Sequence, residues 1–463
     1  MKKYFFLFLF VLLLTTICFK SSLLYPFNDW DDSNMYLSMG RIIAGGGTPY
    51  VDIYDHKGPL TFFLYGFIYL LPGDHFTGLY IVELISAFCF LYISYKTTLL
   101  SKNSTSIIPI LLLGMVYTSK VFRAGGSMEE LFLPLLMYIV YIYIKAVDTH
   151  CLPTIPESVF AGIIIGVLLL TKFTLLATIL GVYICYTFYC IHNRQLKHYF
   201  TFALSNMAGC LTVFLPLFIY LLQKGLITDM FEAYITTNLT DYNPEITWLH
   251  GFTYGLLTTP FFLLAVIVCI FILMKKRKKP DILVISVLLF IVTFMKKPYG
   301  YYEIPLCILI SLALPYIPIP SKPQKCPAFL PAIGLLILSY FLSPNTYLIH
   351  YSKEELPQYR FHETIQEDSL LCITSLDLGF YTTGNKPIPC KYLGIYNANV
   401  EPVARQLSSL AHSEEYEYII TDTGCQQLVT KVENYELVEQ IEFPRDAIRN
   451  YTETYYLYRL NHK

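Results

Sequence analysis

The chain has 463 residues, of which 55% are hydrophobic and 16% aromatic, and only 14% are charged, against roughly 25% in an average soluble protein. This excludes disordered, collagen-like and small disulfide-scaffold proteins, and a single globular core cannot bury so many apolar residues. The 33 basic and 34 acidic residues balance, so we expect no nucleic-acid partner, and the absence of a C-x-x-C pair among twelve cysteines gives no support to zinc ribbons or thioredoxin-like motifs.

Apolar stretches long enough to cross about 30 Å of hydrocarbon recur along the first three quarters of the chain. They predict an all-α polytopic membrane protein with about eleven transmembrane helices. The expected spans are 4–20, 76–97, 106–119, 130–147, 159–171, 173–190, 200–222, 251–274, 281–295, 303–319 and 327–343. No A-x-A-like cleavage site follows the first span, so we interpret it as a membrane anchor instead of a signal peptide.

Basic residues fall on one side of the membrane if these spans alternate, and the positive-inside rule identifies that side as the cytoplasm. They are Lys2, Lys3, Lys102, Lys145, Arg194, Lys197, the run 275–279, Lys322 and Lys325. The N-terminus is therefore expected in the cytoplasm. The other side receives the loops 20–75, 120–129, 223–250 and 296–302 and the tail from about residue 344.

The sequence divides into a membrane domain, residues 1–343, and a tail, residues 344–463, of different character. Strand-like runs at 416–421, 436–443 and 455–460 alternate in the tail with helix-like segments such as 403–411. We expect a small extracytoplasmic α/β domain. Three cysteines lie in it (Cys372, Cys390 and Cys425), so one disulfide is possible, although the spacing does not assign a pair.

The first external loop holds two polar stretches, 28–36 (NDWDDSNMY) and 45–59 (GGGTPYVDIYDHKGP). Aspartates just beyond a membrane span, followed by aromatic residues, are typical of a polar site at the membrane surface. The alternative is that Asp32 or Ser33 simply caps a helix that continues through Tyr36. The run 45–47 lacks the ending of a phosphate-binding loop, and we interpret it as a link between two interfacial helices.

A second polar cluster, 120–131 (KVFRAGGSMEEL), lies between the third and fourth spans. In so short a loop the carboxylates of Glu129 and Glu130 are near the bilayer surface, where charged groups cost free energy unless they pair or bind something. Alternatively, both glutamates stabilise the N-terminus of the next helix through its dipole, and the two roles can coexist.

Cations on the expected outer side are the third signal, because the positive-inside rule predicts few of them there. They are Lys57, Arg123, Lys172, Lys296 and Lys297. Alone, Lys172 is explained by snorkelling at a tight turn, but together the cations suit an anionic lipid phosphate, which an arginine can bind bidentately. Tyr301 and Tyr302 add aromatic rings beside this charge, and an interfacial aromatic belt explains them equally well.

These motifs resemble those of the GT-C membrane glycosyltransferases, in particular bacterial members of the superfamily of dolichyl-phosphate-mannose–protein mannosyltransferases and aminoarabinose transferases. In that family an aspartate just after the first span opens a D-x-x-x-aromatic motif, which Asp32 and Tyr36 match, with Ser33 where the family often has glutamate. Residues 46–60 are similar to a signature of many bacterial members, and 125–130 and 171–173 are weaker matches. The resemblance covers about residues 1–340, and 296–302 departs from the histidine or arginine frequent in relatives.

The resemblance implies transfer of a sugar from a polyprenyl-phosphate donor to an acceptor hydroxyl on an envelope glycan, lipid or protein, at the outer face of the bacterial cytoplasmic (inner) membrane. Asp32 is the expected base, with Glu129 and Glu130 assisting. The expected phosphate-binding cations, which stabilise the leaving group, are Lys57, Arg123, Lys172, Lys296 and Lys297. The expected substrate-binding residues are Tyr36, Asp52, Asp55, His56, Tyr301 and Tyr302. The resemblance further implies a single displacement with inversion, for which one base is sufficient and no carboxylate nucleophile is paired with an acid.

No metal and no cofactor is assigned, because one histidine beside flexible loop carboxylates, as in His56 with Asp52 and Asp55, is a weak metal signal. A transporter or flippase of lipid-linked sugars is the main alternative function. It predicts charges inside the spans and pseudo-repeated halves, whereas here the charges gather in external loops. A structural scaffold is a third possibility, and it predicts that replacement of Asp32 is harmless.

Overall fold

The computed structural model describes residues 2–73, 76–101, 106–240, 248–277, 280–295, 299–317, 328–366, 369–397, 400–446 and 451–461. The chain divides into two compact units. The first unit comprises Met1–Phe19, Tyr80–Lys224 and Asn243–Thr346, and the second comprises Lys20–Leu79, Gly225–Tyr242 and Tyr347–Lys463. Residues 20–75, expected to form the first external loop, thus belong to the same unit as the tail, whereas a linear division at residue 343 separates the two segments.

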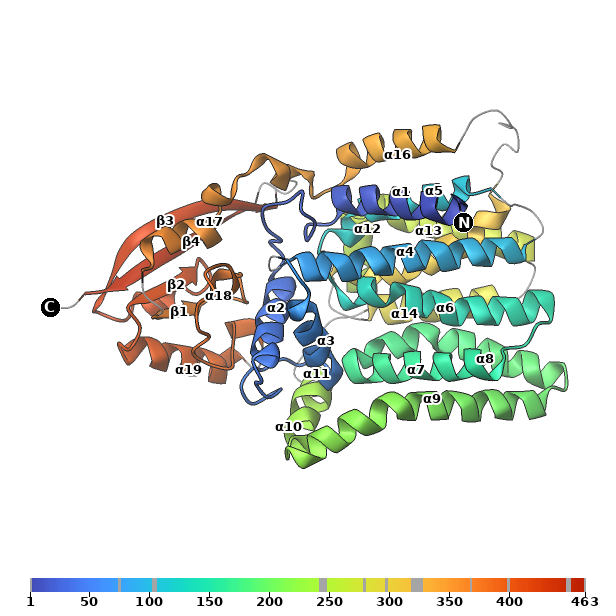
Figure 1. Cartoon of the computed structure of the whole chain (residues 1–463), viewed down its shortest axis with the longest axis horizontal. Coiled ribbons are helices and arrows are strands. Elements are labelled where there is room, and N and C mark those ends of the chain that lie inside the picture. The colour runs from blue at the N-terminus through green and yellow to red at the C-terminus, as the bar shows by residue number, and fades with distance from the viewer. Residues whose placement is uncertain are drawn as a thin grey trace. The chain divides into compact units, whose positions relative to one another are not determined.

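The first unit is helical, and Figure 1 shows its long helices running side by side. Its helices are α1 (Lys2–Cys18), α4 (Thr77–Leu100), α5 (Ile108–Gly114), α6 (Met128–Thr149), α7 (Ile155–Thr171), α8 (Leu176–His192), α9 (Leu196–Gln223), α12 (Trp248–Thr258), α13 (Pro260–Arg277), α14 (Asp281–Phe294), α15 (Cys307–Ala313) and α16 (Phe329–Leu342). Short 3₁₀ turns extend or join them: η1 (Met115–Thr118), η2 (Lys120–Phe122), η3 (Phe173–Leu175), η5 (Gly300–Leu306) and η6 (Leu314–Tyr316).

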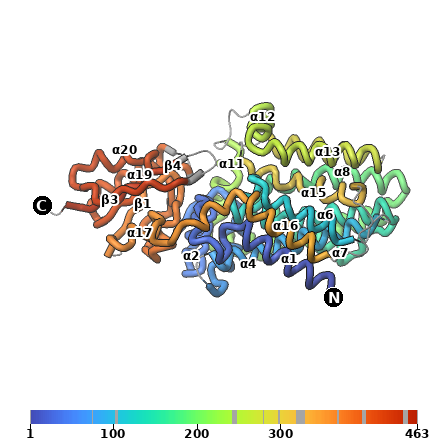
Figure 2. Tube along the Cα trace, turned by 90° about the horizontal axis from the view of Figure 1, so that it is seen from above, coloured from blue at the N-terminus to red at the C-terminus, as the bar shows by residue number. Residues whose placement is uncertain are grey.

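Helices form at each expected span, but they differ in length. Among the described residues, four are long and apolar enough to cross a membrane: Thr77–Leu100, Met128–Thr149, Phe173–His192 and Leu196–Gln223. A fifth results if α12 and α13 count as one span, although they are bent by 109° (Figure 2). Pro260 lacks the N–H that a continuous helix needs, which explains the break inside the expected span 251–274. The total of about eleven spans stays a prediction.

Helices α7 and α9 approach each other closely because glycines face backbone at their crossing. A Cβ atom on Gly162 would lie 2.0 Å from the carbonyl oxygen of Asn206, and one on Gly209 would lie 2.0 Å from that of Val159. Small residues at such crossings are the usual means by which membrane helices pack, since close backbone approach maximises van der Waals contact.

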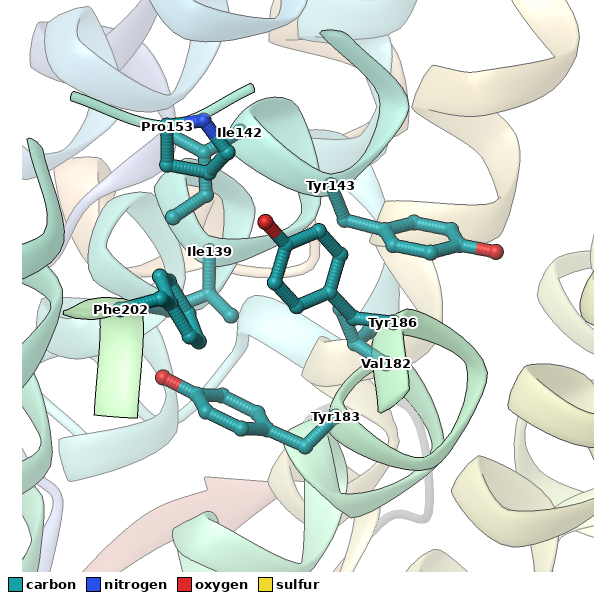
Figure 3. A pocket seen from close by; sticks show the side chains of 8 residues that line it. All are labelled: Ile139, Ile142, Tyr143, Pro153, Val182, Tyr183, Tyr186 and Phe202. Carbon is teal, nitrogen blue, oxygen red and sulfur yellow. The ribbon is translucent and has the colours of Figure 1, made fainter. Parts of the chain in front are cut away.

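Tyrosines from α6 and α8 line a small apolar cavity together with Phe202 of α9 (Figure 3). Its volume is about 10 Å³, which is room for a single water molecule. The hydroxyl of Tyr143 donates to Asp281 Oδ2 at 2.9 Å, and that of Tyr183 donates to Asn206 Oδ1 at 2.9 Å. These phenols therefore join helices, and the cavity is a feature of packing.

The second unit combines helices of the first external loop with the tail. Its helices are α2 (Asp31–Ala44), α3 (Pro59–Leu70), α10 (Ile227–Met230), α11 (Thr237–Thr240), α17 (Pro357–Thr364), α18 (Phe380–Thr383), α19 (Val400–His412) and α20 (Gln426–Val429), with a π-helical turn at Phe231–Thr236 and 3₁₀ turns at Thr346–His350, Lys353–Glu355 and Ile395–Asn397. Its strands are β1 (Leu370–Ile373), β2 (Tyr418–Asp422), β3 (Tyr435–Asp446) and β4 (Tyr451–Leu460).

The four strands form one sheet in the order β1-β2-β4-β3, with β1 and β2 parallel and the other pairs antiparallel. Buried side chains of α19, such as Leu407, pack with Leu371 and Ile419 of the sheet. The expected α/β tail is therefore confirmed, with β1 as an additional strand. Its four residues are all buried and show no alternation, which is why the sequence pattern missed it. Cys372, Cys390 and Cys425 are free thiols.

Helices α2 and α3 approach each other closely at two glycines. A Cβ atom on Gly40 would lie 2.3 Å from the Tyr65 carbonyl oxygen, and one on Gly66 would lie 3.1 Å from Ile43 Cγ2. The link expected between two helices is present, because α2 ends at Ala44 and Gly46, two residues further on, has a φ of +91° that favours glycine.

Candidate functional site

Asp32 lies in the first turn of α2 and is half-buried. The residue that caps this helix is Trp30, whose side chain makes no capping hydrogen bond, so neither Asp32 nor Ser33 is the N-cap. Among the neighbouring aspartates, Asp29 is held by an ion pair with Lys20 and by the Tyr347 hydroxyl, which donates to its Oδ2 at 2.7 Å. Asp32 lies at the positive end of the helix dipole, which favours a negative charge.

Two buried asparagines fix the chain where α2 begins. The amide of Asn34 donates to the carbonyl oxygens of Asn28 and Trp30, both at 2.9 Å. Asn28 in turn donates to the Ser21 hydroxyl at 2.9 Å. Because these bonds join α2 to the segment that precedes it, the position of its first turn is determined by more than helix propensity.

Asp55, His56 and Lys57 form a buried cluster before α3. The Lys57 ammonium lies 2.8 Å from His56 Nε2 and 3.7 Å from Asp55 Oδ1, and the Lys57 backbone N–H donates to the same oxygen at 2.8 Å. Since an ammonium only donates, His56 Nε2 is the acceptor. The other carboxylate oxygen, Asp55 Oδ2, has no hydrogen-bond partner within the part of the chain that the structure describes.

Asp32 and this cluster are electrostatic neighbours. Burial raises the pKa of Asp55, the nearby Lys57 charge lowers it, and the charge of Asp32 raises it further. The Lys57 ammonium also lies 5.8 Å from the centre of the Tyr36 ring. The structure thus brings together five of the residues selected from the sequence, Asp32, Tyr36, Asp55, His56 and Lys57.

Two further residues support this cluster and were not selected from the sequence. The Tyr50 hydroxyl donates to the Lys57 carbonyl oxygen at 2.9 Å, and the Asn238 amide of α11 donates to that of His56 at 2.6 Å. Tyr50 is inside the family-like string, whereas nothing in the sequence connects Asn238 with a loop 182 residues away. Asp52, by contrast, accepts from the Thr48 backbone N–H at 2.6 Å and stabilises an exposed turn.

A separate charged cluster occurs in the first unit. Glu129, near the N-terminus of α6, forms an ion pair at 2.7 Å with Lys172, the residue that follows α7. The Lys172 ammonium also lies 5.5 Å and 4.7 Å from the ring centres of Tyr301 and Tyr302 in η5. The exposed fractions of the two charged side chains are 1% for Glu129 and 12% for Lys172, so each compensates a charge that would be costly alone.

Glu130 has a different environment from Glu129. Ser127 caps α6 by accepting from the Glu130 backbone N–H at 3.2 Å, and the Glu130 carboxylate accepts from the Gly126 backbone N–H at 3.2 Å. Its charged neighbour is the buried Glu83 of α4. Glu130 therefore turns back to the start of its own helix. Arg123 follows η2 and is half-buried, and Lys296 and Lys297 lie outside the described residues.

No protein-family model matches the chain, and no curated protein gives a significant match. Solved structures do match its fold. ArnT from Cupriavidus metallidurans, crystallised with undecaprenyl phosphate, is 10% identical with a TM-score of 0.65, and the match covers 97% of each chain. Its apo form gives a TM-score of 0.64 at 10% identity and the same coverage.

The arabinofuranosyltransferase AftD from Mycobacteria, 11% identical with a TM-score of 0.52, matches 100% of this chain over 40% of its own longer chain. ArnT and AftD are both GT-C glycosyltransferases, and they share little sequence with this chain. The chain therefore has the fold of the GT-C membrane glycosyltransferases, as the resemblance of its motifs predicts.

Proposed function

We propose that the protein is an integral-membrane glycosyltransferase that transfers a sugar from a polyprenyl-phosphate donor to an acceptor hydroxyl at the outer face of the bacterial cytoplasmic membrane. The observation that carries the proposal is the proximity of Asp32, Asp55 and Lys57 in a chain with this fold. A structure of similar fold was crystallised with undecaprenyl phosphate, the kind of lipid phosphate that a donor of the proposed class releases. The acceptor is a glycan, lipid or protein, and the tail is extracytoplasmic.

In the proposed reaction, Asp32 is the base. Its carboxylate takes the proton of the acceptor hydroxyl while the hydroxyl oxygen bonds to the anomeric carbon of the sugar. The bond from that carbon to the phosphate oxygen breaks, and the electron pair leaves with the lipid phosphate. One displacement inverts the anomeric centre. Asp32 suits this role better than Asp55, since Asp32 is half-buried while Asp55 is fully enclosed.

Lys57 is the proposed cation for the departing phosphate. Negative charge grows on that group as the bond breaks, so an ammonium already in position stabilises the transition state more than the ground state. Asp55 and His56 hold this ammonium without reorganisation.

In the first unit, Lys172 is a further proposed contact for an anionic lipid head group, with Tyr301 and Tyr302 as neighbouring aromatic surfaces. Glu129 holds its ammonium in place. Arg123, Lys296 and Lys297 remain proposed phosphate-binding residues. We assign Glu130 to the stability of the α6 N-terminus, because its carboxylate bonds to the backbone there.

The test uses the purified full chain in proteoliposomes, a panel of radiolabelled polyprenyl-phosphate sugars and envelope acceptors. Asp32→Asn removes basicity with almost no change of volume, so we expect transfer to be lost while folding is retained. Asp31→Asn is the matched control, because it neutralises the adjacent carboxylate in the same helical turn. Full activity of Asp32→Asn would refute the base assignment. No transfer by folded wild type, together with translocation of labelled lipid, would favour a flippase.

A further inference from the structure

Helix α2 carries Asp32 in its first turn and is bound further along by the tail. The Ser38 hydroxyl donates to Asp377 Oδ2 at 2.5 Å, and the other oxygen of Asp377 accepts from the Gly379 backbone N–H at 2.8 Å. The Thr382 hydroxyl lies 2.9 Å from that of Ser38. Because Ser38 has a single hydroxyl proton and gives it to the carboxylate, Thr382 is the donor in the second contact.

This chain of hydrogen bonds is fully enclosed, since Ser38, Asp377 and Thr382 are all buried. A buried carboxylate is stable only where its oxygens find donors, and Asp377 has one on each oxygen. The Ser38 hydroxyl is thus a required partner of Asp377, which makes the contact specific for both position and residue type.

Arg41, one turn beyond Ser38, adds a second polar contact between α2 and the tail. Its Nη1 donates to the Tyr381 carbonyl oxygen at 3.0 Å, and its Nη2 donates to that of Lys386 at 2.6 Å. Tyr381 is in the short helix α18, so the guanidinium binds one backbone oxygen within that helix and one in the segment after it. Both bonds are charge-assisted, and their directions fix the rotation of α2 about its axis.

Close packing near the start of α2 supplies a third contact. Gly379, which precedes α18, has a φ of +88°, and a Cβ atom there would lie 2.6 Å from Asn34 Oδ1 and 2.6 Å from Phe27 Cζ. Only glycine satisfies both conditions. Asn34 is also the residue that ties the first turn of α2 to the preceding segment, so the tail touches the part of the helix that holds Asp32.

The tail makes these contacts with the loop that follows β1, at the carboxyl ends of its two parallel strands. Asp422, at the end of β2, stiffens that loop by accepting from the backbone N–H groups of Ser375 at 2.7 Å and Cys425 at 2.9 Å. Open α/β sheets generally bind their ligands at this edge. Here the edge is occupied by a helix of the same chain.

We propose that Asp377 is a positioning residue for sugar transfer: by binding Ser38 it fixes α2, and thereby the carboxylate of Asp32. The inference rests on the proposed role of Asp32 as the base, and it gives the tail a function in catalysis. Ser38 is six residues beyond Asp32, about 9 Å along the helix axis, so Asp377 acts through a rigid helix without touching the reacting atoms.

The test compares the full-length wild type with Asp377→Ala, Asp377→Asn and Ser38→Ala. Misplacement of a catalytic group by about 1 Å costs roughly 100-fold, so we expect kcat of Asp377→Ala to fall about 10- to 100-fold, with KM values for donor and acceptor unchanged. Asp377→Asn keeps an oxygen that accepts from Ser38, and we expect it to restore part of the rate. The control is Glu439→Ala, which breaks an exposed ion pair with Arg360 in the tail and leaves kcat unchanged.

Hydrogen exchange of residues 31–44 is measured on the same proteins, because it reports on the docking of α2 independently of activity. We expect faster exchange in Asp377→Ala and Ser38→Ala than in the wild type and in Glu439→Ala. Unchanged kcat in a folded Asp377→Ala would overturn the positioning role alone, and unchanged exchange would overturn the docking on which it depends. Ser38→Ala, the milder change, gives the answer if Asp377→Ala does not fold. No transfer by wild type in any assay would overturn the proposed function itself, and the positioning role with it.

Discussion

Replacement of Lys172 by methionine tests the energetics of the charged cluster in the first unit. The change leaves Glu129, whose side chain is 1% exposed, as a buried charge without its cation. Breaking a buried ion pair from one side costs about 3–5 kcal/mol. Loss of the cation–π contacts with Tyr301 and Tyr302 costs about 0.5–2 kcal/mol, much of which a methionine sulfur near the same rings restores. We therefore expect a free energy of unfolding about 3–5 kcal/mol lower than that of the wild type.

A double-mutant cycle extends this test by also removing the charge of Glu129. It compares the wild type, Lys172→Met, Glu129→Gln and the double variant. In the double variant neither residue of the pair is charged. Replacement of a whole buried ion pair by uncharged groups often changes stability little, so we expect the double variant to be more stable than Lys172→Met. The assay is denaturant unfolding of the four proteins in mixed micelles, followed by circular dichroism, with the coupling energy taken from the cycle. A double variant whose loss equals the sum of the single losses, within about 0.5 kcal/mol, would refute the reasoning.

Two further predictions concern the second unit. Gly40→Ala places a Cβ atom 2.3 Å from the Tyr65 carbonyl oxygen, so we expect a loss of about 1–3 kcal/mol in the free energy of unfolding and reduced transfer. Gly45→Ala is the control, because the nearest atom to its Cβ is 3.4 Å away, and we expect it to change both quantities little. Equal effects of the two substitutions would contradict the packing argument. Burial raises the pKa of Asp377 above its ordinary value of 3.8. At pH values between 3.8 and the folded-state pKa, the folded protein therefore holds a proton that the unfolded chain has released. The free energy of unfolding should thus fall as pH rises through this range. Asp377→Asn should weaken this fall, measured as the unfolding midpoint at successive pH values, and an identical pH dependence in both proteins would argue against it.

The sequence was most informative where one physical signal dominates. Continuous apolar runs predicted helices at every expected span, and alternation predicted β2, β3 and β4. The bend at Pro260 and the short strand β1 were missed. A single proline within an apolar run does not reveal whether a helix breaks there. The four residues of β1 are all buried, so they lack the alternation of polar and apolar residues that identifies a strand.

For the candidate site, the sequence indicated which residue types matter but not how they pair. Lys57 and Lys172 were both selected as cations, yet one is held by Asp55 and His56 and the other by Glu129 and two rings. Glu129 and Glu130 are adjacent in sequence, and only the direction of each side chain separates an ion pair from a helix-end contact. Such differences arise from tertiary packing, which local sequence patterns do not reveal.

The second unit is assembled from three segments that leave the ribosome at different times. Ser38 and Arg41 are made about 340 residues before the loop that binds them. At about 5–20 residues per second, α2 waits roughly 20–70 s for that partner, with its polar side chains still unmatched. Synthesis of the long helices is therefore complete before α2 gains these contacts, so the proposed transfer requires that the tail has been made and folded. Proteins truncated by premature termination before residue 377 would lack this final step of assembly.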